Sequence, residues 1–106
     1  MTGQDHSTVD LLGRRLDLVA NLSALTAAMH KLIQEAAGTE MEILRLQLAL
    51  GREPANTEFA HELREAEDRA EAIQSAQAEA LEEIAAVEAT VAQIDHEIAA
   101  AKGGRS

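Results

Sequence analysis

The sequence predicts an all-α protein: a long antiparallel two-helix hairpin, similar to a coiled coil, and three observations support this. From Phe59 to Ala101, apolar or small residues recur at alternating steps of four and three, with Gln77 the only polar member. Such a row lies along one side of a helix and has to be covered by another helix. The same spacing runs from Leu11 to Leu50. Thirdly, the chain has one aromatic residue and few β-branched residues, which is too little for a sheet.

These two rows together are called the core seam. In the first half of the chain its members are Leu11, Arg15, Leu18, Leu22, Leu25, Met29, Leu32, Ala36, Thr39, Ile43, Leu46 and Leu50, with Arg15 as a polar exception. In the second half they are Phe59, Leu63, Ala66, Ala70, Ile73, Gln77, Ala80, Ile84, Val87, Val91, Ile94, Ile98 and Ala101.

The first helix is expected over residues 8–50, after a flexible segment over residues 1–7. Ser7 or Thr8 would cap its start, because hydroxyl side chains accept hydrogen bonds from the free N–H groups of a first turn. Gly38 leaves an alternative open. The helix could end there and a third helix could begin, although a glycine inside a helix costs only about 1 kcal/mol and the core seam continues unshifted.

A turn is expected over residues 51–54, followed by the second helix over 54–102 and a flexible tail over 103–106. Gly51 suits the position after a helix end, and Pro54 suits the first turn of the next helix. A connection this short makes the two helices antiparallel neighbours within one domain. Large seam residues then face small ones, which allows close packing.

A second row of apolar residues lies beside the core seam and is expected to be an oligomer interface. Two helices can each cover one side of the other, so this second row needs a further partner, and self-association into a four-helix bundle or a larger oligomer would provide one. A different protein partner is the alternative. The predicted interface residues are Val9, Leu12, Leu16, Val19, Ile33, Leu81 and Ala85.

The formal net charge of −10 lies in the second half of the chain. Five acidic and five basic residues balance from Ser7 to Arg52, whereas twelve acidic residues meet two basic ones from Thr57 to Ala99. Such a surface repels phosphates, so nucleic-acid binding should be weak, with local polyanion contact limited to Arg14 and Arg15. Near the turn, a partner-docking surface is predicted at Met41, Leu48, Glu62 and Glu65.

No catalytic, nucleotide-binding or metal-ligand motif is recognisable, so we expect no enzyme activity, no cofactor and no metal site. The sequence has no cysteine and no apolar run near the length of a membrane span, which suggests a cytoplasmic protein with no membrane contact.

The expected function is that of a non-enzymatic homo-oligomeric scaffold, adaptor or accessory subunit that binds itself and another protein. Two alternatives follow from the hairpin plan. It resembles the helical-hairpin oligomerisation core of the small subunits of phage-type DNA-packaging terminases, which implies an accessory subunit of a nucleic-acid machine. It also looks like the stalks of secretion and export chaperones.

Overall fold

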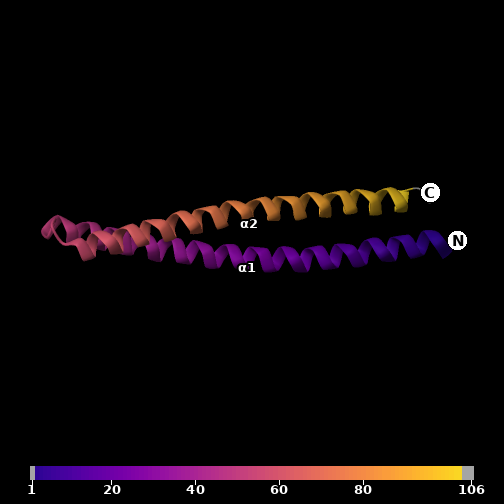
Figure 1. The fold of residues 1–106 in the computed structure, drawn as a ribbon. Helices are drawn as coiled ribbons and strands as arrows, with labels where there is room; N and C mark the ends of the chain where they lie inside the picture. The colour runs from indigo at the N-terminus through magenta and orange to yellow at the C-terminus, as the bar shows by residue number, and fades with distance from the viewer. Residues whose placement is uncertain (1, 104–106) are drawn as a thin grey trace. The chain divides into compact units, whose positions relative to one another are not determined.

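The chain folds into two long helices joined by a short turn, in a computed structural model that describes the backbone of residues 2–103 and the side chains of residues 8–103 (Figure 1). Helix α1 spans Thr2–Arg52 and helix α2 spans Thr57–Gly103. No strand occurs among the described residues. The predicted all-α antiparallel hairpin is therefore confirmed.

Each of two compact units is built from both helices. The turn unit comprises Ala28–Ala80, that is, the end of α1, the turn and the start of α2. The terminal unit comprises the described residues up to Ala27 together with those from Leu81 onward. Every core-seam position in either unit is buried or half-buried, so the predicted seam is confirmed in both.

In the turn unit the core is centred on Leu46 and Ala66, which are both fully buried. Complete burial of a leucine side chain contributes about 1.5–3 kcal/mol. Thr39 is also buried, and its hydroxyl donates a hydrogen bond to the Glu35 carbonyl at 2.9 Å, which satisfies the polar group. Because α1 continues through Gly38, Thr39 lies inside one helix and the alternative of a break there is wrong.

In the terminal unit the buried core consists of Ile94 and Ile98 of α2. Leu11, Leu18 and the other leucines of the seam in α1 are half-buried. The seam residues of α1 are therefore only partly covered in this unit, and apolar side chains beside them, such as Leu16, stay exposed.

The helix boundaries differ from the predicted ones at three places. Helix α1 begins at Thr2 rather than at residue 8, because a Ser or Thr caps a helix only where the residues before it leave the helical conformation. At the other end, Gly103 belongs to α2 rather than to a tail. The rest of the predicted tail, residues 104–106, lies outside the described part of the chain, as does residue 1.

The third difference is the turn, which comprises residues 53–56 instead of 51–54. Gly51 remains within α1, with no glycine of the described chain at positive φ. Pro54 lies in the turn and does not open α2. Gly51 and Pro54 can each lie either within a helix or in the turn beside it. The side chain that decides where α2 begins is Asn56.

Asn56 caps α2. Its Oδ1 accepts a hydrogen bond from the Phe59 N–H at 2.9 Å, and its carbonyl accepts one from the Ala60 N–H at 3.2 Å. The Asn56 N–H in turn donates to the Glu53 carbonyl at 3.0 Å, which closes the turn. A side-chain oxygen that accepts a hydrogen bond from a free N–H of the first turn stabilises a helix start.

Replacing Asn56 by Ala is expected to lower the free energy of unfolding by about 1 kcal/mol, because the Phe59 N–H loses its acceptor. Denaturant unfolding followed by circular dichroism measures the change. Asn56→Asp is the matched control, since it keeps an oxygen at the same place and should retain most of the stability. Equal losses in the two variants would contradict the cap.

Candidate oligomerisation surface

Residues that directly follow core-seam positions share one side of the helix pair. Each step along an α-helix turns by about 100°, and in two antiparallel helices whose seams face each other this step goes to the same side. In the turn unit, Glu42 and Arg69 each precede a seam residue, and Arg69 Nη2 donates to Glu42 Oε2 at 2.8 Å. Residues that directly precede seam positions therefore lie on one side of the helix pair. Residues that directly follow seam positions lie on the other side.

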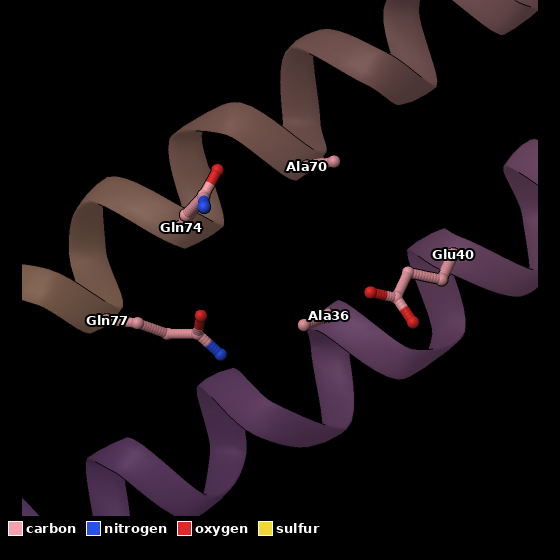
Figure 2. A pocket seen from close by; sticks show the side chains of 5 residues that line it. All are labelled: Ala36, Glu40, Ala70, Gln74 and Gln77. Carbon is pink, nitrogen blue, oxygen red and sulfur yellow. The ribbon is translucent and has the colours of Figure 1, made fainter.

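A hollow of about 200 Å³ in the turn unit opens on that second side (Figure 2). Its lining contains Glu40 and Gln74, which both follow seam positions, and the seam residues Ala36, Ala70 and Gln77. Figure 2 shows Gln77 and Glu40 pointing toward the space between the helices. The two alanines are too small to fill it, so the close packing expected from the sequence is interrupted here.

In the terminal unit, the side that follows the seam is apolar on α1 from Val9 to Val19 and mixed on α2. On α1 it carries Val9, Leu12, Leu16 and Val19, whose side chains are between 37% and 71% exposed. On α2 it carries three exposed alanines and one leucine, which alternate with the exposed charged residues Glu88, Asp95 and Lys102. We call the apolar residues of this side the apolar face, and its α2 members are Leu81, Ala85, Ala92 and Ala99.

All seven residues predicted as an oligomer interface are exposed in the single chain. Six of them lie on the apolar face of the terminal unit. Ile33 is in the turn unit, 48% exposed, on the side that follows the seam. The sequence predicted an apolar row on each helix separately. The antiparallel arrangement places both rows on the same side of the helix pair.

The pair Arg14 and Arg15, predicted as a polyanion contact, is divided by the structure. Arg14 is exposed, whereas the half-buried Arg15 donates from Nε to Asp95 Oδ1 at 2.5 Å and from Nη2 to Asp95 Oδ2 at 3.4 Å. This hydrogen bonding, with the attraction of the carboxylate, raises the pKa of Arg15 above its ordinary value. Asp95 was not singled out from the sequence, although a cation in the seam requires an acid nearby.

The four residues predicted for partner docking do not share one environment. Met41 and Leu48 are 72% and 60% exposed and lie two residues beyond seam positions, on the outer side of α1. Glu62 is half-buried, next to the seam residue Leu63. Glu65 forms an exposed pair with His61, whose Nε2 lies 2.6 Å from Glu65 Oε1. Their exposure and neighbours therefore differ, and partner docking at these four residues stays a prediction.

Among the side chains of residues 8–103, no three His, Asp or Glu groups lie closely enough together to hold a metal ion. Neither helix contains, over the same residues, a stretch long and apolar enough to cross a membrane. The sequence matches no known protein family, no curated protein and no solved structure.

Proposed function

We propose that this protein is a non-enzymatic helical-hairpin scaffold or adaptor that works by self-association and by contacts with other proteins. The observation that supports it is the apolar face of the terminal unit. Leu12 and Leu16 are 45% and 71% exposed, next to Val9 and Val19 on the same helix. Removing such side chains from water contributes about 25 cal/mol per Å² of apolar surface, so this face favours a protein partner.

The arrangement of α1 supports self-association in particular. Over residues 9–19 this helix has two apolar sides about 100° apart, the core seam and the residues that follow it. A helix in a four-helix bundle contacts two neighbours in this way, one on each side. One neighbour is α2 of the same chain, and a second copy provides the other without a further gene product.

The experiment is native mass spectrometry with light scattering over a range of protein concentrations. We expect an oligomer for the unchanged chain and a monomer for the double variant Leu12→Glu/Leu16→Glu, because two carboxylates in the contact would be buried without partners. The matched control is Met41→Glu/Leu48→Glu, which adds the same charge at similarly exposed apolar positions and should leave the oligomer intact.

Two outcomes would contradict the proposal. One is a monomer at every concentration of the unchanged chain. The other is an unchanged oligomer in the Leu12→Glu/Leu16→Glu variant, which would mean that a different surface mediates assembly. Circular dichroism of each variant shows whether the helices have been retained.

A further inference from the structure

The hollow of the turn unit is lined by polar groups that no other side chain uses (Figure 2). Its lining consists of the Glu40 carboxylate, the amides of Gln74 and Gln77, and the methyl groups of Ala36 and Ala70. Among the described residues, none forms a hydrogen bond or an ion pair with the side chains of Glu40, Gln74 or Gln77. Glu40 and Gln77 point into the space between the helices. The hollow therefore combines free hydrogen-bond acceptors with apolar walls.

The surface around the hollow is acidic. Glu40, Glu67 and Glu71 directly follow seam positions, so they lie on the side of the helix pair on which the hollow opens. Among the residues of the turn unit that follow seam positions, Arg64 is the only Lys or Arg, and it is about 9 Å from Ala70 along α2. The turn unit as a whole has eleven acidic and five basic residues. Its field therefore attracts cationic groups.

The guanidinium group of arginine matches this set of acceptors. It carries five N–H donors in one plane, so it can bond to a carboxylate of one helix and an amide oxygen of the other at the same time. It is more weakly hydrated than the ammonium group of lysine and loses less on entering a partly enclosed space. The aliphatic part of the side chain can lie against the alanine methyl groups.

We propose that the hollow binds an arginine side chain from a basic segment of another protein. The guanidinium donates charge-assisted hydrogen bonds to Glu40 and is oriented from α2 by Gln77, while Glu67 and Glu71 attract neighbouring basic residues of the same segment. Nucleic acids and anionic membranes are disfavoured as partners, because the same carboxylates repel their phosphates. This inference rests on the proposed contacts with other proteins and names the chemistry of the partner.

Fluorescence anisotropy of a labelled peptide, at physiological ionic strength, tests the site. The peptide has three arginines separated by Gly-Ser pairs, and a second peptide has lysines at the same places. We expect the arginine peptide to bind the unchanged chain more tightly than the lysine peptide. Glu40→Gln should weaken binding of the arginine peptide about tenfold, because the acceptor loses its charge.

A second variant, Ala70→Leu, fills the hollow without changing any charge and should weaken binding at least as much. The matched controls are Glu35→Gln, which removes the same charge from α1, and Ala72→Leu, which adds the same side chain to α2. Glu35 and Ala72 are exposed and directly precede seam residues, so they lie on the opposite side of the helix pair. Both controls should bind the peptide almost as the unchanged chain does. Circular dichroism of each variant shows whether the helices are retained.

Several results would overturn the site. Equal losses in Glu40→Gln and Glu35→Gln would mean that the acidic surface attracts the peptide in general. Unchanged binding by Ala70→Leu would mean that the hollow is not occupied, and equal affinity for the two peptides would remove the preference for arginine. Absence of peptide binding to the unchanged chain would also overturn it.

The oligomeric state without peptide separates this inference from the proposed self-association. Failure of peptide binding with an intact oligomer would leave self-association standing, whereas a monomer that binds the arginine peptide would leave the arginine site standing. Dissociation of the oligomer by Glu40→Gln alone would overturn the site as proposed, because the hollow would then receive a second copy of the chain.

Discussion

Replacing Leu46 by Ala is expected to lower the free energy of unfolding by about 2–5 kcal/mol. Leu46 is fully buried in the turn unit, and truncation removes its contacts and leaves a cavity that long, stiff helices close only in part. Urea unfolding followed by circular dichroism measures the loss. We would use the Leu12→Glu/Leu16→Glu background, so that dissociation of an oligomer does not contribute to the signal.

Leu48→Ala is the control for this prediction. Leu48 is on the same helix two residues further on, but its side chain is 60% exposed, so its truncation should change the stability by less than about 0.5 kcal/mol. Losses of equal size at the two positions would mean that the core seam does not carry the stability of the turn unit.

Replacing Ala66 by Leu is expected to cost about 1–3 kcal/mol, although it adds apolar surface and keeps a good helix former. Ala66 is fully buried, so the added atoms have to push α1 and α2 apart or leave their preferred rotamers. The melting temperature and the denaturant midpoint should both fall. The same unfolding measurement serves for this variant as for Leu46→Ala.

Ala70→Leu gives the comparison one helical turn further along the same seam. Ala70 lines the hollow of about 200 Å³, so a leucine there has room and should cost less than the one at Ala66. An Ala66→Leu variant as stable as the unchanged chain would show that the helices yield easily at Ala66. A larger loss at Ala70 than at Ala66 would show that the hollow does not accept a side chain.

Periodicity predicted the fold because one constraint governs most of the chain. Every apolar residue in the seam has to face the other helix, and a row from Phe59 to Ala101 permits one register along α2. The structure buries or half-buries each member, including the polar exceptions Arg15, Thr39 and Gln77. Arg15 and Thr39 fit because their polar atoms reach an acceptor, and Gln77 lines the hollow between the helices.

The turn was harder to predict because several residues carry helix-end signals within a short stretch. Gly51 and Pro54 both suggested an earlier turn, and neither excludes a helix at its own position. The boundary depends on which side chain satisfies the free N–H groups of α2, and Asn56 does this with a hydrogen bond of 2.9 Å. Such a choice depends on distances that a one-dimensional pattern does not contain.

The sequence predicted the individual residues of the candidate surface, but not that the residues of the two helices lie on one side. The rows through Leu12 and through Ala85 were visible in the sequence, whereas their position on one side depends on the handedness of the helix and the antiparallel arrangement. The Arg69–Glu42 hydrogen bond, on the opposite side, shows that handedness directly in the turn unit. The hollow beside Ala36 was also missed, because a register states which residues face each other and not how well they fill space.

The short turn has a consequence for the order in which the chain folds. The Glu42–Arg69 contact closes a loop of 27 residues, whereas the Arg15–Asp95 contact closes one of 80, and the longer closure costs about 1 kcal/mol more in chain entropy. Contacts between α1 and α2 should therefore form near Asn56 first and then at increasing distance from the turn. During synthesis, residues 8–27 of α1 have no segment of α2 to pack against until residues 81–103 have been made.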